Sequence, residues 1–230
     1  MIRLDKYLSE NGYTRKEAIS LIASGNVKVN YQIVTKKDYK VNELSDAISV
    51  YNKDIIYNKY IYIMLNKPIG IITATEDKTQ KTVLDLLPPE ILCKKVFPVG
   101  RLDKDTCGLL LITNDGEFCH KMISPKHCVS KIYKFCLCDE ITISQKENIE
   151  QGITLKDGYT TLPCEIKLVD NKSGEITITE GKYHQIRRMF GAIGNKVCFL
   201  ERISEGKIKL DPTLARGEFR YLTKNEIENN

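Results

Sequence analysis

A short polar segment near residue 55 constrains the fold most, because the sequence pattern before it differs from the pattern after it. Residues 51–59 are rich in turn-forming and charged side chains and favour a linker. The pattern before them is helical and basic, whereas short apolar runs of strand type recur after them. A chain of 230 residues can hold a small domain and a medium one. We therefore predict a small domain over 1–50, a linker over 51–59 and a larger domain over 60–230.

The first fifty residues are predicted to form two short helices followed by strands. Apolar residues recur at helical spacing over 4–8. Thr14 and Glu17 then have the spacing of a capping box, in which a hydroxyl and a carboxylate satisfy free amides at the start of a helix. Alternating apolar residues at 27–29 and 47–50 indicate strands.

The second part of the chain mixes strands and helices without a repeating order. This pattern predicts an α+β domain with a large mixed, mainly antiparallel sheet flanked by helices. The apolar runs that indicate strands lie at 60–65, 96–99, 109–113, 132–138, 176–179 and 197–200. Helical spacing occurs near 117–123, 144–151 and 184–193.

The composition favours a cytoplasmic protein without metal. No apolar run approaches the ~20 residues that span a bilayer, and the first residues lack the apolar stretch of a secretory signal. None of the eight cysteines forms the Cys-x-x-Cys pair of zinc and redox sites. We expect reduced thiols.

Net charge is mildly positive, which permits but does not demand a nucleic-acid partner. The formal charge is +5, of which ten basic and seven acidic residues in 1–60 supply +3. A solvated helix surface explains any single basic residue equally well. Those on polar positions of the predicted helical pair and the first strand are Arg3, Lys6, Arg15, Lys16 and Lys28.

The densest stretch of functional side chains lies at 97–116. It runs Phe-Pro-Val-Gly-Arg-Leu-Asp-Lys-Asp-Thr-Cys-Gly-Leu-Leu-Leu-Ile-Thr-Asn-Asp-Gly, so a polar loop precedes an apolar strand and Asn114-Asp115-Gly116 indicates a turn. Loops fixed by a rigid strand often present catalytic side chains. For a generic Asp-x-Asp pair, however, capping of backbone amides is the commoner role.

The full string at 100–116 is similar to the catalytic signature of the pseudouridine synthases of the RsuA and large-subunit branch. Segments 124–133, 180–190, 200–203 and 214–223 resemble further parts of these enzymes in the same order, and residues 1–50 resemble the S4 RNA-binding module. Large-subunit enzymes tend to have Arg-Asn-Arg-Gln where this chain has Lys182-Tyr-His-Gln, which favours the small-subunit (RsuA) type.

The resemblance implies roles for individual residues. Asp103 corresponds to the nucleophile, Tyr133 to the active-site tyrosine and Arg187 to the active-site basic residue. It further implies that substrate contacts come from Arg101, Leu200, Arg188 and His184, with Arg188 as the fallback for Arg187. In the S4 module the five basic residues named above would grip RNA phosphates.

The implied reaction is site-specific conversion of a uridine to pseudouridine in 16S rRNA, of the uridine-516 type, within rRNA or an assembling small subunit. The C1′–N1 bond breaks, the uracil turns and a bond forms at C5, so neither metal nor organic cofactor is required. One carboxylate can attack C1′ or C6, and the sequence does not choose between them. We expect a monomer without membrane association.

Three other interpretations stay open at this point. The same chemistry could act on 23S rRNA. A metal-dependent hydrolase or phosphotransferase could use Asp103, Asp105 and Asp115, since carboxylates that converge bind Mg²⁺. A non-catalytic ribosome-binding protein could rely on the S4-like domain alone.

Overall fold

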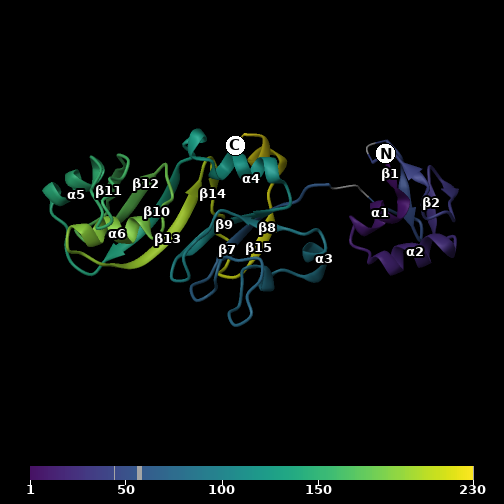
Figure 1. Ribbon diagram of the computed structural model, residues 1–230, viewed down its shortest axis with the longest axis horizontal. Helices are drawn as coiled ribbons and strands as arrows, with labels where there is room; N and C mark the ends of the chain where they lie inside the picture. Colours follow the sequence, from purple (N-terminus) through teal and green to yellow (C-terminus); the bar gives the residue numbers. More distant parts are fainter. Residues whose placement is uncertain (44, 56–58, 230) are drawn as a thin grey trace. The chain divides into compact units, whose positions relative to one another are not determined.

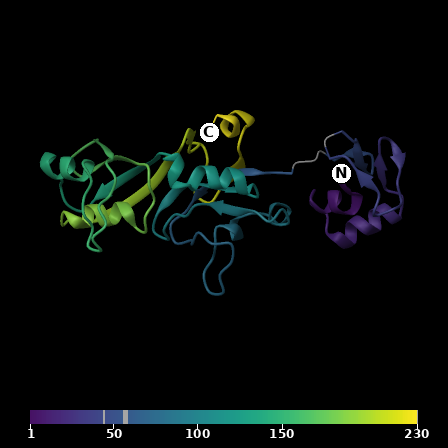
Figure 2. The same cartoon turned by 45° about the horizontal axis from the view of Figure 1, so that its top comes forward.

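The computed structural model describes residues 1–43, 45–55 and 59–229 (Figures 1 and 2). Contacts divide the chain into two compact units. One comprises Met1–Ile61 with Leu87–Val96, and the other comprises Tyr62–Leu86 with Phe97–Asn230. We describe each unit by itself, as the N-terminal domain and the second domain.

The N-terminal domain packs two short helices against small sheets. Helices α1 (Leu4–Ser9) and α2 (Arg15–Ala23) follow strand β1 (Ile2–Arg3), which pairs with β4 (Lys40–Val41). The four-stranded sheet has the order β3 (Gln32–Ile33), β2 (Val27–Val29), β5 (Ile48–Val50) and β6 (Lys53–Asp54). The domain's buried core consists of Leu4, Tyr7, Leu8, Ala18, Ile22, Val27, Val29, Val41, Ile48 and Val50.

Local signals account for this domain. Thr14 and Glu17 form the predicted capping box, with the Glu17 amide donating to Oγ1 of Thr14 at 3.2 Å and the Thr14 amide donating to Oε2 of Glu17 at 2.7 Å. Within the segment predicted as a linker, Lys53–Asp54 forms strand β6, whereas 56–58 lie outside the described residues.

The second domain is built on one nine-stranded sheet (Figure 1). Its main order is β11-β12-β10-β13-β9-β7-β15, with β14 paired to β13 and β8 paired to β9. Every pairing is antiparallel except that between β9 and β13. The strands are β7 (Tyr62–Lys67), β8 (Phe97–Val99), β9 (Cys107–Thr113), β10 (Lys131–Leu137), β11 (Glu165–Leu168), β12 (Ser173–Ile178), β13 (Val197–Glu205), β14 (Ile208–Lys209) and β15 (Phe219–Tyr221).

Helices accompany both halves of this sheet (Figure 1). α5 (Ile143–Glu150) and α6 (Gln185–Ala192) lie beside β10–β13, and α4 (Gly116–Ile123) lies beside β8 and β9. Other short helical segments of this unit are α7 (Lys224–Glu228) and the 3₁₀ turns Leu84–Leu86 and Pro125–His127, whereas α3 (Pro89–Leu92) belongs to the N-terminal unit. The segment 114–116, predicted as a turn, connects β9 to α4: the chain bends at Asn114, and the helix begins at Gly116. The Asp115 carboxylate accepts hydrogen bonds from the amides of Glu117 and Phe118 as an N-cap.

The parallel junction of β9 and β13 requires a glycine. Gly108 has φ +100°, and a Cβ atom there would lie 2.2 Å from the carbonyl oxygen of Arg202. Only glycine allows the two backbones to approach this closely. The junction brings the loop before β9 next to β13.

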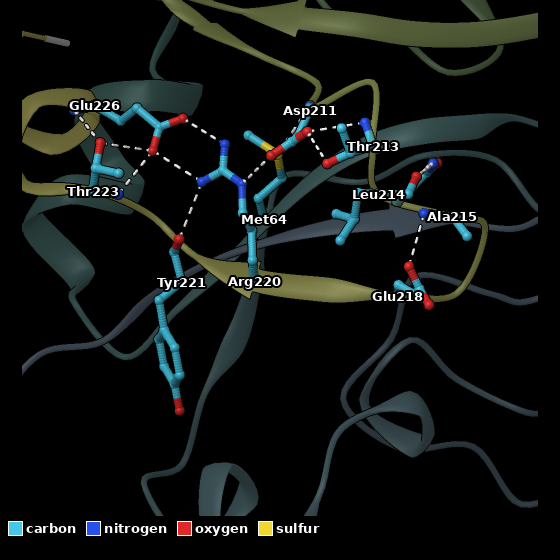
Figure 3. Close-up of polar contacts among 11 residues, drawn as sticks. Met64, Asp211, Thr213, Leu214, Ala215, Glu218, Arg220, Tyr221, Thr223 and Glu226 are labelled. Carbon is cyan, nitrogen blue, oxygen red and sulfur yellow. Dashed lines mark hydrogen bonds and ion pairs between the residues drawn. The ribbon is translucent and has the colours of Figure 1, made fainter.

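An ionic clamp holds the C-terminal segment against the sheet (Figure 3). The Arg220 guanidinium donates to Asp211 at 2.7 Å and to both carboxylate oxygens of Glu226 at 3.0 and 2.8 Å. Hydrogen bonds from Thr213 and, to a smaller extent, Arg220 lower the pKa of Asp211 to about 2, and those from Arg220 lower the pKa of Glu226 to about 2. The segment from 211 to 226 is therefore fastened beside β7, to which β15 pairs.

Candidate active site

The loop between β8 and β9 carries Asp103, and a buried lysine holds this loop through hydrogen bonds to its backbone. Asp103 is partly buried, with 30% of its side chain exposed. The Lys67 amine at the end of β7 is fully buried. It donates to the carbonyl oxygens of Pro68, Asp103 and Thr106 at 3.0, 3.1 and 2.8 Å. The backbone at Asp103 and Thr106 is thereby held at the end of β7.

The start of α6 supplies two side chains to the same place. His184 occupies the N-cap position with φ 48°, and its Nε2 lies 3.6 Å from Oδ1 of Asp103. One turn later, Arg187 donates to the carbonyl oxygens of Val197 and Asp105 at 3.0 and 3.1 Å. Its Nη2 lies 3.0 Å from the Asp105 carboxylate, and its buried Nε has no hydrogen-bond partner among the described residues. The guanidinium is thus ion-paired with Asp105 rather than Asp103.

Strands β10 and β13 contribute Tyr133 and Leu200, both of which are buried. These side chains line one cavity together with Asp103, His184 and Arg187. The exposed side chain of Arg101 lies at its rim. The cavity therefore collects a carboxylate, a phenol, an aliphatic wall and basic groups from separate elements.

Arg188 points elsewhere. Its Nη2 lies 2.5 Å from the Asp157 carboxylate and its Nη1 donates to the carbonyl oxygen of Tyr183 at 3.3 Å. It does not line the cavity that holds Asp103 within the described chain. The structure brings all the other residues predicted for the catalytic pocket together.

The electrostatic environment of Asp103 balances burial against nearby cations. Burial raises the pKa of the Asp103 carboxyl above its ordinary value, and the carboxylate of Asp105 acts in the same direction. His184, Arg187 and Lys67 lower it. The carboxylate is thus partly desolvated, and on balance its pKa is raised although three basic groups oppose the shift.

The predicted RNA-binding residues lie on the N-terminal domain. Arg3, Lys6 and Arg15 line one shallow depression, whereas Lys16 is exposed on α2. Arg3 is bound to Asp5 through two hydrogen bonds of 3.0 and 2.7 Å. Lys28 on β2 donates to the side-chain oxygen of Asn52 at 2.8 Å.

The carboxylates of the hydrolase interpretation do not converge. Asp115 caps α4 and accepts a hydrogen bond of 2.7 Å from the Tyr62 hydroxyl. Asp105 pairs with Arg187. Among residues 1–43, 45–55 and 59–229, no three His, Cys, Asp or Glu side chains could hold a metal ion together.

Comparisons with known proteins agree with this geometry. A family model described as RNA pseudouridylate synthase matches residues 61–192, and an S4 domain model matches residues 2–48. The chain belongs to the RNA pseudouridylate synthase family. It is an isomerase, and the predicted α+β fold with an N-terminal S4 domain and a pseudouridine synthase domain is confirmed.

Relatives of this pseudouridine synthase match over the whole chain. It is 42% identical to "Ribosomal small subunit pseudouridine synthase A" of Vibrio cholerae, covering 98% of each chain. It is also 42% identical to "Uncharacterized RNA pseudouridine synthase YtzG" of Bacillus subtilis, covering 98% of this chain and 97% of the relative. A crystal structure of a pseudouridylate synthase superimposes with a TM-score of 0.71 at 37% identity, covering 100% of this chain and 99% of that one. The predicted resemblance to the RsuA type is confirmed.

Two features of the synthase site escaped sequence analysis. The role of Lys67 was not predicted, since its three carbonyl partners lie in loops that the sequence does not place. The burial of Arg202 and Glu205 behind Tyr133 was not foreseen either. No helix in the described part of the synthase is long and apolar enough to cross a membrane.

Proposed function

We propose that this pseudouridine synthase isomerises one uridine of 16S rRNA, of the uridine-516 type, with Asp103 as nucleophile. The observation that carries the proposal is the placement of Asp103. Its carboxylate lines a cavity whose other walls are a tyrosine, a leucine and a histidine from three different elements. A uracil is flat and polar at its edge, so it fits between apolar faces beside a carboxylate.

Asp103 attacks either the ribose C1′ or the base at C6, and the C1′–N1 bond breaks. For this step the carboxylate must be ionised in a pocket that excludes water. Burial raises its pKa, which strengthens it as a nucleophile, while His184 and Arg187 keep the charged form accessible. No organic cofactor takes part in this scheme.

Tyr133 and Leu200 hold the uracil while it turns. Tyr133 stacks on the ring and takes the C5 proton once the new bond has formed, and Leu200 packs on the opposite face. Arg101 and His184 contact the ribose and phosphate at the rim. The target uridine must leave its stack to enter the cavity, at a cost of a few kcal/mol.

Arg187, rather than Arg188, is the active-site basic residue in this proposal. Arg187 reaches the Asp103 loop through Asp105 and Thr106, whereas Arg188 is paired with Asp157 outside the cavity. We expect Arg187→Gln to lower kcat by about a hundredfold and Arg188→Gln to cause a much smaller loss. A single-turnover assay of both variants compares the two arginines directly. Equal losses would contradict the assignment.

The assignment to 16S rRNA rests on the printed names of relatives that cover nearly the whole chain, such as the small-subunit synthase of Vibrio cholerae. The S4 domain would add affinity and orientation through contacts of basic side chains with phosphates. We expect Arg15→Ala with Lys16→Ala to weaken RNA binding and to flatten its salt dependence. Unchanged binding at every salt concentration would contradict this placement of the RNA surface.

Primer extension after carbodiimide (CMC) treatment tests the proposal. Unmodified 16S and 23S rRNA, naked and in assembling particles, are incubated with wild-type protein and with Asp103→Asn. The expected result is one new stop in 16S rRNA that the variant does not produce and that EDTA does not remove. Asp105→Asn is the matched control, since it makes the same chemical change two residues away and should keep partial activity.

The other outcomes each overturn part of the proposal. A stop in 23S rRNA would keep the mechanism and refute the small-subunit assignment. Loss of the stop in EDTA would favour a metal-dependent reaction. An identical stop with Asp103→Asn would refute Asp103 as the nucleophile.

A further inference from the structure

An irregularity in the sheet places two buried charged side chains, Arg202 and Glu205, near Tyr133. On β10 and β13, Lys131 faces Glu205 and Ile132 faces Ser204, but Tyr133 faces Arg202. Ile203 is therefore an extra residue on β13, as in a β-bulge. Because of it, the side chains of Arg202 and Glu205 lie on the same face of the sheet although they are three residues apart.

Arg202 and Glu205 form an ion pair inside the protein. Arg202 Nη2 lies 3.0 Å from Glu205 Oε2, and the two side chains are 2% and 0% exposed. Arg202 Nε also donates to the carbonyl oxygen of Leu109 at 2.8 Å. Within the described residues, neither carboxylate oxygen of Glu205 has a hydrogen-bond partner of good geometry.

The burial of this ion pair carries a large desolvation penalty for a purely structural element. Buried ion pairs often contribute little stability compared with apolar residues of similar volume, because two charges lose their hydration. Glu205 bears this cost with little hydrogen bonding, and burial raises the pKa of its carboxyl. The position of the pair beside an active-site residue therefore points to a role in the reaction.

Arg202 lies directly opposite Tyr133 across the pairing of β10 and β13, and both side chains line a second cavity. On balance the pKa of the Tyr133 phenol is raised: burial raises it most, Arg202 lowers it, and Glu205 and Asp103 raise it. The acidic and basic side chains that line the cavities shared with Tyr133 are Arg202, Glu205, Lys131, Asp103, Glu180, Lys182, His184, Arg187 and Arg101.

We propose that Arg202 is a positioning residue for Tyr133: the guanidinium holds the phenol against the uracil and stabilises negative charge on the phenol oxygen. Glu205 limits this stabilisation of the phenolate. The inference rests on the proposed function of Tyr133 as acceptor of the C5 proton. The phenol first loses its proton to solvent. The C5–H bond of the rejoined uracil then breaks, the proton passes to the phenolate oxygen, and the C–H electron pair restores the C5=C6 double bond.

The charges of the pair predict opposite effects of two variants that each remove one charge. Arg202→Gln removes the cation that favours the phenolate, so removal of the C5 proton should slow by about tenfold or more. Glu205→Gln removes the anion that disfavours the phenolate, so the same step should be at least as fast as in the wild type. A purely structural ion pair would make both variants slower.

Single-turnover rates with unmodified rRNA containing either uridine or [5-²H]uridine measure this step. With Arg202→Gln we expect a slower reaction and a larger isotope effect, because breakage of the C5–H bond limits the rate more strongly. With Glu205→Gln we expect no loss of rate and no increase in the isotope effect. Arg202→Lys keeps the positive charge and should recover most of the rate.

Two further variants keep the outcomes distinct. Arg202→Gln with Glu205→Gln removes both charges, so it retains a folded core if the single arginine variant melts at a lower temperature. Tyr133→Phe tests the proposed function itself: full activity of this variant would refute Tyr133 as proton acceptor. If Tyr133→Phe is inactive but both charge variants slow the reaction with an unchanged isotope effect, the role of Arg202 is refuted and that of Tyr133 stands.

Discussion

The buried amine of Lys67 allows a quantitative prediction about stability and pH. Burial lowers the pKa of this lysine from 10.5 to about 8 in the folded protein. Below pH 8 the amine is charged in both the folded and the unfolded state, so folding includes the cost of burying a charge. Above pH 10.5 it is neutral in both states and this cost is absent. The contribution to stability is therefore present above the unfolded pKa and is lost as the pH falls through the folded pKa.

The size of the effect follows from the shift. A difference of about 2.5 pKa units corresponds to about 3 kcal/mol. Lys67→Met replaces the amine with an uncharged side chain of similar length, so it removes this pH dependence. The wild type should consequently gain about 3 kcal/mol of unfolding free energy relative to Lys67→Met between neutral pH and a pH above 10.5.

Urea denaturation of the wild type and Lys67→Met at both pH values measures this difference. Tyrosines, thiols and other lysines titrate in the same interval, but they are present in both proteins and cancel in the comparison. Lys78→Met is the matched control, since Lys78 is exposed and the same chemical change should give a difference that does not vary with pH. A pH-independent difference for Lys67→Met as well would refute the lowered pKa.

The same variant tests whether Lys67 fixes the loop that carries Asp103. Its amine binds the carbonyl oxygens of Asp103 and Thr106, so without it the proposed nucleophile loses this backbone support. Small displacements of a reacting group can cost about a hundredfold in rate. We expect Lys67→Met to lower kcat by at least about tenfold and Lys78→Met to leave it unchanged. Full activity of a folded Lys67→Met protein would show that the loop is held by other contacts.

Two further predictions concern the sheet. Gly108→Ala should cost at least about 3 kcal/mol of unfolding free energy in a urea titration, because the new Cβ would meet backbone atoms of β13 at a positive φ. Gly116→Ala is the control and should cost little, since a Cβ there meets nothing within 4 Å. A small cost at both positions would contradict the close approach of the strands. Arg220→Gln should lower the melting temperature at neutral pH but much less near pH 2, because the stabilisation from the ionised Glu226 carboxylate is fully present above its ordinary pKa of 4.5 and is lost as the pH falls through the folded value of about 2. Equal losses at both pH values would show that the clamp acts through packing rather than charge.

Local signals in the sequence predicted most helices and strands of the second domain. The apolar runs at 109–113 and 132–138 correspond to β9 and β10, and the helical spacing near 117–123 corresponds to α4. Short edge strands such as β11 were not predicted, because four residues with alternating polarity do not differ from a loop. Aspartate followed by glycine suits both a turn and a helix start, and the capping role of Asp115 appears only from the amides that it caps.

The residues of the candidate site that lie in a sequence motif could be predicted, whereas those brought there only by contacts between distant strands could not. Asp103, Tyr133 and Leu200 lie in recognisable strings, and the structure places them around one cavity. Lys67 acts on the loop at Asp103, 36 positions further along the chain, and only the folded sheet shows that contact. Arg202 depends on a bulge, which is a property of two strands together and leaves no mark in either one.

The architecture of the sheet explains why these groups meet. Among the described residues, the two antiparallel parts of the sheet join only through the parallel contact of β9 with β13, at Cys107–Gly108 against Glu201–Arg202. The loop that carries Asp103 enters β9 at this point, while β13 carries Leu200 and Arg202 past it and β10 brings Tyr133 opposite. A parallel pair cannot be closed by a short hairpin, so chain segments from both parts must arrive at the junction from different directions. The cavity that holds Asp103 lies where these segments arrive, and a change at Gly108 should therefore disturb activity as well as stability.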